Sequence, residues 1–483
     1  MKRTIAIVGS LVVLMTMGVP LYAQDSPEQE TENDASTEST EAIDGAESSD
    51  TAEPDAQGES SAAFGIEAAF GVTSFTNSET GAVETYQLLA LRPELTLGRF
   101  GVGLDLPFNY RFTGGDDRDE FEVREEDWVP NDDTSFLELY LPKFRYVRYG
   151  QKGDDIYAQL GNLPGATIGN GFIVSGYTNE LYLPDRRISG AVFDFDRALA
   201  GERYFGMETM VSNLAAWDLL AGRLYVRPLA GTAIPLLPEL QLGVTVAADR
   251  DPFYFAERDP DSDVYQDAPS DESVLVWGID ARQPILARSA VSLAAYGDLV
   301  FQEDRMGGMV GAGGRLLGFL IYGAQIRVTE DNFIPEYFDR SYDRRRLERL
   351  ARYNEAVSVD GGAGWWTRIG FSLLADAVVF SNTISGPFSV DSSAYPELQS
   401  QLAIAEGVVP GFAGLSANAS YTKFDIRGWD DLATAEDAII GAQINIRSGP
   451  VVISLVYDLV YDPESPDDDP WVVSSGLETA ITF

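Results

Sequence analysis

The C-terminal segment 471–483, WVVSSGLETAITF, constrains the fold more than any other part of this chain. Leu477, Thr479, Ile481 and Phe483 fall at every second position, and the residues between them are small or polar. A β-strand turns successive side chains to opposite faces, so one face of this segment is apolar and the other is not. The segment is therefore predicted to form an amphipathic strand that ends on an aromatic residue.

The same alternation recurs over most of the chain. In segment 100–112 every second residue is apolar, from Phe100 to Phe112, and the opposite face carries Gly101, Asp105 and Arg111. A strand in a soluble protein has about 5–6 residues. These runs reach ten to thirteen residues, the length that a tilted strand needs to cross a bilayer.

The lengths of the predicted connections give a second signal, because short and long connections alternate. Short connections are predicted at 98–99, 150–154, 285–288, 318 and 448–450, and long ones at 114–134, 163–186, 250–272, 330–361 and 463–470. If the strands run up and down, the long connections all lie at one end of the sheet. Around Gly370 the pattern fits either one strand or two, and the stretch 396–405 shows no regular alternation.

The N-terminal part of the chain has a different character. Residues 1–23 combine Lys2 and Arg3 with an apolar run that ends in Leu21-Tyr22-Ala23, which predicts a secretory signal peptide cleaved after Ala23. Residues 24–62 hold thirteen acidic residues, no Lys or Arg and one large apolar residue. Such a segment cannot offset its ordering entropy, so it is predicted to be disordered, either as a spacer or as a tether for a basic periplasmic partner.

An exported chain that ends in an amphipathic strand resembles the bacterial outer-membrane porin-like β-barrels. The resemblance implies an all-β fold: a transmembrane antiparallel up-and-down barrel over residues 63–483, with about 18 strands (16–20) and long external loops. It also implies location in the cell outer membrane, contact with outer-membrane lipid, and insertion by the barrel-assembly machinery, which would read Phe483 and Ile481 as an assembly signal. A soluble secreted β-sandwich is the alternative, but sandwiches seldom reach ~400 residues as one unit.

Composition removes several function classes. The chain of 483 residues has no Cys, no His and a net charge of −42. The lack of Cys excludes a disulfide scaffold, and the lack of His excludes a Ser-His-Asp hydrolase. Asp259, Asp261 and Asp263 form only a weak candidate metal site, because Val264 and Ser270 occupy positions where a calcium loop needs Gly and Glu. No enzyme activity, cofactor or nucleic-acid partner is expected.

The inward face of the predicted strands carries charges of both signs in equal number. The basic residues are Arg111, Arg223, Arg227, Arg282, Arg315, Arg327, Arg368 and Arg447, and the acidic residues are Glu67, Asp105, Glu208, Asp249, Asp280, Asp298, Asp458 and Glu478. These side chains are predicted to line a polar lumen with an acidic mouth. They would either line a wet channel or form salt-bridged ladders that hold the shape of the barrel.

Two loops stand out as candidates for a constriction or a ligand site. Segment 161–179 carries little charge, several glycines that include Gly169 and Gly171, and an apolar trio that begins at Phe172. A loop in water has little reason to hold such a trio, whereas a loop folded into the barrel would bury it. The alternative is a loop packed on its external neighbours.

Segment 332–356 holds six arginines. Its apolar residues recur at helical spacing, and on that helix Arg345, Arg349 and Arg352 share one face. Guanidinium groups in a row suit carboxylate or phosphate ligands. Local ion pairing with Asp339, Asp343 and Glu348 is the alternative. If this loop folded inward, its charge would favour anions over the cations that the acidic mouth attracts.

These patterns lead to two functional hypotheses. The first is a porin-like channel for passive diffusion of small hydrophilic solutes. The second is a surface-interaction or structural barrel, similar to an adhesin, with a plugged lumen. The sequence does not indicate an oligomeric state.

Overall fold

The computed structural model describes residues 62–76, 83–115, 118–130, 134–182, 186–196, 203–255, 273–389, 392–434, 436–461 and 471–482. The predicted signal peptide and nearly all of the acidic segment lie outside these residues. No helix in the described part of the chain is long and apolar enough to cross a membrane.

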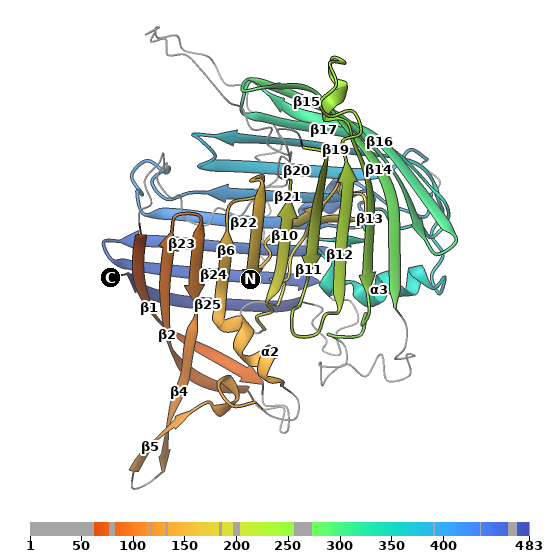
Figure 1. Ribbon diagram of the computed structural model, residues 1–483. Coiled ribbons are helices and arrows are strands. Elements are labelled where there is room, and N and C mark those ends of the chain that lie inside the picture. The colour runs from red at the N-terminus through yellow and green to blue at the C-terminus, as the bar shows by residue number, and fades with distance from the viewer. Residues whose placement is uncertain are drawn as a thin grey trace.

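The described strands form one antiparallel sheet that closes on itself (Figure 1). Its first half comprises β1 (Ala62–Thr76), β2 (Val83–Leu97), β3 (Phe100–Leu104), β6 (Phe144–Tyr149), β7 (Ile156–Gly161), β10 (Gly190–Phe195), β11 (Phe205–Val211), β12 (Leu219–Val226), β13 (Gln241–Asp249) and β14 (Val274–Arg288). Its second half comprises β15 (Val291–Gln302), β16 (Arg305–Leu316), β17 (Leu320–Thr329), β19 (Gly362–Leu373), β20 (Val378–Pro387), β21 (Glu397–Ile404), β22 (Leu415–Lys423), β23 (Ala438–Ser448), β24 (Val451–Tyr461) and β25 (Trp471–Thr482).

The last strand pairs with the first, so the ring has no free edge. β25 pairs antiparallel with β1 from Glu67↔Thr482 to Gly71↔Glu478. The prediction of a closed up-and-down β-barrel is therefore confirmed. The described ring has 20 strands, at the upper limit of the predicted range and two more than the favoured number. The stretch around Gly370 is one strand, β19, and the stretch at 396–405 is largely another, β21.

The predicted alternation of faces is present in the ring. Along β13 and β14 the buried positions, such as Thr245 and Asp280, alternate with exposed apolar ones, such as Val244 and Ile279. Buried side chains point into the barrel, and exposed apolar side chains cover its outer surface. The terminal segment follows the same rule, with Leu477 on the outside and Ala480 buried.

The predicted long connections lie at one end of the barrel and the predicted short ones at the other, but the short-turn end also holds the long connection 227–240 and the long-loop end the two-residue turn 303–304. The short-turn end includes the turns at 98–99, 289–290, 317–319 and 449–450, and the long-loop end includes the connections at 162–189 and 330–361. The turn predicted at 285–288 is wrong, because β14 continues to Arg288. Pro284 lies at a β-bulge, where a missing N–H is tolerated.

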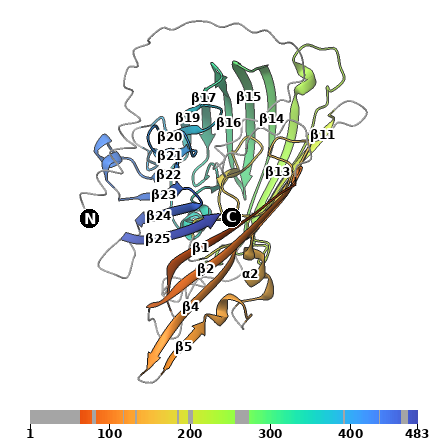
Figure 2. The same cartoon turned by 90° about the vertical axis from the view of Figure 1, so that its left-hand side faces the viewer.

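One hairpin projects from the ring at the long-loop end (Figures 1 and 2). β4 (Leu106–Gly115) continues the line of β3 past Asp105, pairs with β2, and then pairs with β5 (Arg118–Val123). A 3-10 turn, η1 (Glu125–Asp127), a short helix, α2 (Phe136–Tyr140), and a second turn, η2 (Leu141–Lys143), return the chain to β6. Two further 3-10 turns, η3 (Leu237–Glu239) and η6 (Trp429–Ala433), lie in the connections β12–β13 and β22–β23.

The two loops singled out by sequence fold into the barrel and pack on each other. The first holds β8 (Ala166–Ile168) and β9 (Val174–Tyr177), and the second holds β18 (Phe338–Asp339), η5 (Tyr342–Arg344) and α3 (Arg346–Tyr353). β18 pairs with β9, so the loops share a small three-stranded sheet. We call this pair of loops, residues 162–182 and 330–361, the inner plug.

The hydrophobic core of the molecule lies between the inner plug and the barrel wall. Plug residues Phe172, Val174, Phe333 and Tyr342 are buried in one cluster with inward-facing side chains of β11 to β16. The wall residues in this cluster are Met210, Leu219, Ala221, Ala247, Val274, Val276, Val300 and Met309. The plug thus fills the lumen on one side, against β11–β16, and faces β17–β21 with its other side.

Candidate functional site

The first plug loop is fixed to the wall at its tip. The backbone N–H of Gly169 donates a hydrogen bond of 2.7 Å to the Glu208 carboxylate on β11, and Asn170 donates one of 3.2 Å to Asp298 on β15. Gly169 has a φ of +63°, and a Cβ there would lie 3.0 Å from Cδ of Arg223. A left-handed backbone and close contact both favour glycine at this position.

The apolar trio of this loop contacts the second loop. Phe172, Ile173 and Val174 are all buried, and the Phe172 ring stacks on Phe333 with 5.9 Å between centroids. The trio therefore packs inside the barrel, as the inward alternative required, and not on external neighbours.

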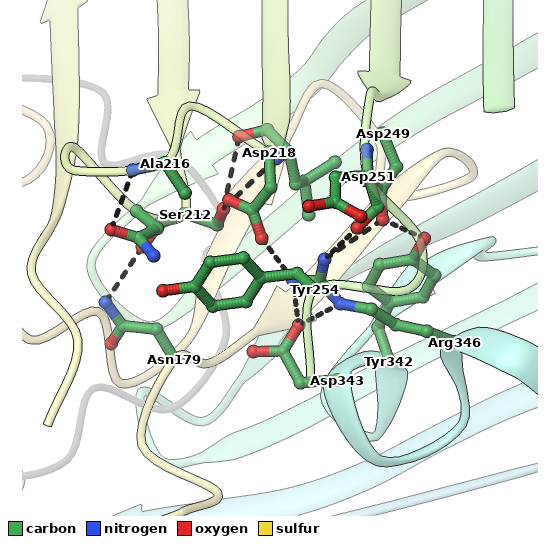
Figure 3. Close-up of polar contacts among 12 residues, drawn as sticks. Asn179, Ser212, Ala216, Asp218, Asp249, Asp251, Tyr254, Tyr342, Asp343 and Arg346 are labelled. Atoms are coloured by element: carbon green, nitrogen blue, oxygen red, sulfur yellow. Dashed lines mark hydrogen bonds and ion pairs between the residues drawn. The ribbon is translucent and has the colours of Figure 1, made fainter. Parts of the chain in front are cut away.

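An ion cluster joins the second plug loop to the rim of the wall (Figure 3). The guanidinium of Arg346 lies 2.7 Å from a carboxylate oxygen of Asp218, 2.7 Å from Asp343 and 3.2 Å from Asp249. Asp218 precedes β12 and Asp249 ends β13, whereas Asp343 belongs to the plug. We call these four residues the rim cluster.

Hydroxyl groups complete the rim cluster. Tyr177 donates a hydrogen bond of 2.9 Å to Asp343, Tyr342 donates one of 2.6 Å to Asp249, and Ser212 donates one of 2.6 Å to Asp218. Burial raises the pKa of Asp343 to about 6, even though Arg346 acts in the opposite direction. Burial acts to lower the pKa of Arg346, but the surrounding carboxylates act more strongly in the other direction. The pKa of Arg346 therefore lies well above its usual value.

The three arginines predicted to share a helix face do so, and they already have partners. Arg349 pairs with Asp339 at 2.5 Å. Arg345 pairs with Glu348 and lies 3.8 Å from Glu397 on β21. Arg352 donates a hydrogen bond of 2.6 Å to the Phe333 carbonyl, and burial lowers its pKa to about 10.

Two cavities lie between the inner plug and the wall strands β17, β19, β20 and β21. The outer cavity, toward the long-loop end, is lined by Thr329, Gly364, Ser385 and Glu397 on these strands and by the Arg345–Arg352 face of α3. The inner cavity, toward the short-turn end, is lined by Gln325, Arg368, Thr383 and Gln399 on the same four strands. The two cavities are therefore stacked along one side of the barrel, and each spans about 1100 Å³ of space that includes open solvent.

An ion pair lies where the two cavities meet. Arg327 on β17 lines the outer cavity, and Glu336 of the plug lines both. Their side chains make two hydrogen bonds, of 3.0 Å and 3.3 Å. The Arg327 guanidinium also lies 5.6 Å from the ring centroids of Phe172 on the plug and of Trp366 on the wall.

The predicted inward charges form several separate groups along the wall. Arg223 binds Asp280 at 2.6 Å and Glu208 at 2.9 Å, and Arg227 makes two 2.7 Å hydrogen bonds with Asp196. Arg447 pairs with Glu406 at 2.7 Å, and Arg315 lies 3.9 Å from Asp376. Arg282 and Arg368 line the inner cavity, and Asp458 lies beside its strand partner Gly441, where a Cβ would be 2.9 Å from the Asp458 carboxylate.

Arg111 lies elsewhere. It is on the part of β4 that pairs with β5, where it binds Glu122 and Glu84 at 2.9 Å each. The alternation that predicted an inward position for Arg111 continues from the ring into the projecting hairpin. The periodicity alone therefore could not distinguish a strand of the ring from a strand of the hairpin.

A further ion cluster of the wall involves an arginine that the sequence analysis did not single out. Arg92 on β2 binds Glu67 on β1 at 3.0 Å, Glu478 on β25 at 2.7 Å and Asp105 at 3.1 Å. Arg187 also binds Asp105. The alternating Leu89, Leu91, Leu95 and Leu97 place Arg92 on the inward face and could have revealed it. No such pattern marks Glu336, which lies in a loop.

Some predicted residues lie outside the described part of the chain. These are Phe483 and the weak metal candidates Asp259, Asp261 and Asp263. Among the described residues, no group of three or more acidic side chains is arranged to hold a metal ion.

Comparisons with known proteins identify no family. No protein-family model and no curated protein matches the chain. Among solved structures, Pseudomonas aeruginosa OccD3 (OpdP) is 12% identical with a TM-score of 0.32, and the match covers 87% of this chain and 91% of that one. Pseudomonas aeruginosa OccK2 (OpdF), solved in complex with glucuronate, is 11% identical with a TM-score of 0.28 and coverages of 87% and 98%.

A mutant of Rh. blastica porin is 9% identical with a TM-score of 0.24, and the match covers 88% of this chain and 100% of that one. Similarities of this size assign neither a subfamily nor a ligand. The porin-like architecture predicted from the terminal strand is established by the pairing of the chain's own strands: a closed antiparallel β-barrel with two loops folded into its lumen.

Proposed function

We propose that this protein is an outer-membrane channel for the passive diffusion of small hydrophilic solutes. The observation that carries the proposal is the pair of stacked cavities between the inner plug and β17–β21. Their lining is rich in Gln, Ser, Thr, Arg and Gly, so the space is suited to water and polar solutes rather than to lipid.

The outer surface of the ring supports a location in a lipid bilayer. Outward positions on successive strands carry exposed apolar side chains, such as Leu224, Val244, Val310, Ile326 and Ile369. Soluble monomers rarely expose a continuous apolar belt of this kind. We infer that lipid covers it, with the short-turn end on the periplasmic side and the long-loop end outside the cell.

In this proposal the Arg327–Glu336 pair is the constriction of the path. It joins the wall to the plug at the boundary between the cavities, and the rings of Phe172 and Trp366 flank it. A solute that passes from one cavity to the other must move past this pair or displace it.

The alternative function, a surface-interaction barrel with a plugged lumen, is favoured by one observation. The inner plug is fixed by a hydrophobic core and by the buried rim cluster. A plug held this firmly would close the lumen permanently and leave the external loops to bind a partner.

Conductance of the refolded full-length chain in planar bilayers separates the two functions. A channel gives steady current steps, and replacing both members of the constriction, Arg327→Gln with Glu336→Gln, increases the step size. The matched control replaces Arg447 and Glu406, an ion pair at the short-turn end, and leaves the step size unchanged. Absence of current through both the native chain and the constriction variant, together with binding to a surface ligand, supports the plugged barrel.

A further inference from the structure

The connections at the short-turn end differ in polarity around the ring. The turns that join β16 to β17, β19 to β20 and β21 to β22 follow one another, because β17 pairs with β19 and β20 pairs with β21. Each of these turns presents a large apolar side chain to the outside: Leu317, Leu374 and Phe412 are between 66% and 70% exposed. We call these three turns the apolar rim.

The connection between β12 and β13 extends this apolar character around the ring. Residues 228–238 contain no charged side chain, and Ile234, Leu236 and Leu237 are exposed. This segment lies against the outside of the barrel, because the side-chain amide of Gln283, an outward-facing residue on β14, donates a hydrogen bond of 2.6 Å to the Leu236 carbonyl. A polar group on the outer surface is thus covered by an uncharged segment of the chain.

The turns on the other side of the ring are polar. Arg99 lies at the tip of the β2–β3 turn with 59% of its side chain exposed, and it pairs at 3.3 Å with Asp154 of the β6–β7 connection. One polar turn, Ser289-Ala290 between β14 and β15, also lies beside the apolar rim. The exposed Arg288 precedes this turn, and so long a side chain can reach water from the edge of a membrane.

Hydrogen bonds between neighbouring turns satisfy backbone groups of the apolar rim. The N–H of Gly318 donates a hydrogen bond of 2.9 Å to the Ala290 carbonyl in the next turn along the ring. The N–H of Ala405, in the β21–β22 connection, donates one of 2.8 Å to the Ala377 carbonyl in the β19–β20 turn. Hydrocarbon offers no hydrogen-bond partner, so backbone groups that enter lipid need partners of this kind within the protein.

The apolar rim is continuous with the apolar outer surface of the ring. On β16 the outward positions from Met306 to Leu316 hold only Met, Gly, Val, Ala and Leu, and Leu317 follows directly. On β17 the outward Ile326 is 55% exposed, and Phe319 in the turn below it is 40% exposed. A surface without a polar boundary is covered by one medium, and we have inferred that lipid covers the belt.

The long-loop end shows the reverse asymmetry. The β4–β5 hairpin, on the opposite side of the ring from β16 and β17, extends the outward apolar face through Phe112 and Phe121. These rings are 58% and 61% exposed, and their centroids lie 5.7 Å apart. At the long-loop end of β15 and β16, by contrast, the turn is Glu303-Asp304, and 91% of the Asp304 side chain is exposed.

We propose that the apolar rim is a lipid-contact surface, immersed in the phospholipid of the inner leaflet, and that the barrel is inclined in the membrane. The inference rests on the proposed outer-membrane location and adds which surfaces the bilayer covers. A bilayer that crosses the ring obliquely covers the apolar rim on one side and the aromatic face of the hairpin on the other. A bilayer perpendicular to the barrel would leave both apolar surfaces in water, which is unfavourable.

The natural chain has no cysteine, so single Cys substitutions can carry a fluorescent label at one chosen depth. The full-length protein is refolded into phosphatidylcholine vesicles whose acyl chains are brominated, because bromine quenches only labels that lie in the hydrocarbon. Labels at Leu317→Cys and Leu374→Cys should lose as much fluorescence as a label at Val310→Cys in the belt. Arg99→Cys and Gln151→Cys are the matched controls on the polar turns, and their labels should instead be quenched by iodide in the water.

A second pair of labels tests the inclination at the long-loop end. A label at Phe121→Cys should be quenched by the brominated lipid, whereas a label at Asp304→Cys should be quenched by iodide. All variants must give the folded band of the native chain on an unheated gel, which separates a change of depth from a loss of the fold.

Three results overturn the proposal. If iodide reaches the labels at 317 and 374 while bromine quenches the label at 310, the apolar rim lies in water and the outer-membrane location stands. If neither quencher reaches the rim labels, a second copy or another protein covers the rim. If the labels at 121 and 304 respond alike, the barrel is not inclined. A label at 310 that escapes bromine is a different failure, because it removes the membrane location itself.

Discussion

At the scale of single residues, the rim cluster is notable for its imbalance. One guanidinium, that of Arg346, serves three buried carboxylates, so negative charge is in excess where water is scarce. Desolvation disfavours the charged form of an acid, and neighbouring acids add to this effect. The cluster therefore holds the plug to the wall more tightly when one of its carboxyl groups carries a proton.

Asp343 makes this dependence measurable. Its pKa is about 6 in the folded protein against an ordinary value of 3.8, because the residue is buried. Since the folded pKa is the higher one, the stabilising proton is bound fully below the ordinary pKa and is lost as pH rises through about 6. Between pH 4 and pH 7 we expect the native chain to lose roughly 2–3 kcal/mol of stability relative to Asp343→Asn. The loss is measured as a fall in the thermal midpoint of the native chain relative to that of the variant. A difference that stays constant over this range would contradict the assignment.

At the scale of elements, the plug depends on close fits with the wall. Arg305, at the start of β16, donates hydrogen bonds of 2.5 Å and 3.3 Å to the carbonyls of Tyr353 and Arg352 at the C-terminus of α3. A cation there offsets the negative end of the helix and satisfies its last carbonyls. Gly307, two residues further, leaves room for the ring of Phe333, so one strand contacts the plug twice.

Gly307→Ala tests the second of these contacts. A Cβ at Gly307 would lie 2.3 Å from the Phe333 ring, so the ring and its loop must move. We expect a loss of about 1–3 kcal/mol in the free energy of unfolding, seen in denaturant melts, and faster proteolysis of the second plug loop. Gly308→Ala is the control, because a Cβ there meets only ordinary contacts at 3.5 Å and 3.6 Å. Equal effects of the two substitutions would show that the fit at Phe333 does not hold the plug.

The sequence predicted the elements of the wall better than those of the lumen. Alternation over ten or more residues depends only on neighbours along the chain, which is why the strands at 100–112 and 471–483 could be recognised. The partners of loop residues could not be predicted from such a local pattern. Arg345 lies near Glu397 and Arg346 binds Asp218, and these pairs join residues far apart in the sequence. The row of arginines therefore suggested a ligand site, where the structure shows charges that are largely paired.

At the scale of the whole molecule, the closure of the ring is reinforced by charge. Arg92 on β2 reaches across β1 to Glu478 on β25, and it also binds Glu67 and Asp105. One side chain thus joins the first, second and last strands, in addition to the backbone hydrogen bonds between β1 and β25.

Replacing this residue should weaken the seam. Arg92→Met leaves Glu67 and Glu478 close together without their cation, while Asp105 keeps Arg187, and we expect a loss of about 3 kcal/mol in stability. Samples are incubated in detergent at rising temperatures and then run on a gel. The folded band of the variant should disappear at a lower incubation temperature than that of the native chain. Arg99→Met removes an exposed ion pair with Asp154 at 3.3 Å and should change stability by less than about 1 kcal/mol. A seam variant as stable as this control would show that backbone pairing alone closes the ring.

The seam also has a consequence for the order of events during biogenesis. Glu67 and Arg92 are made early, whereas Glu478 follows Arg92 by 386 residues. Without β25 the charge cluster is incomplete and the edge of β1 is open, so we expect a chain that lacks this strand to remain unclosed. Since β1, β2 and β25 all contribute to this cluster, we expect lesions in any of these strands to impair closure of the ring in the same way.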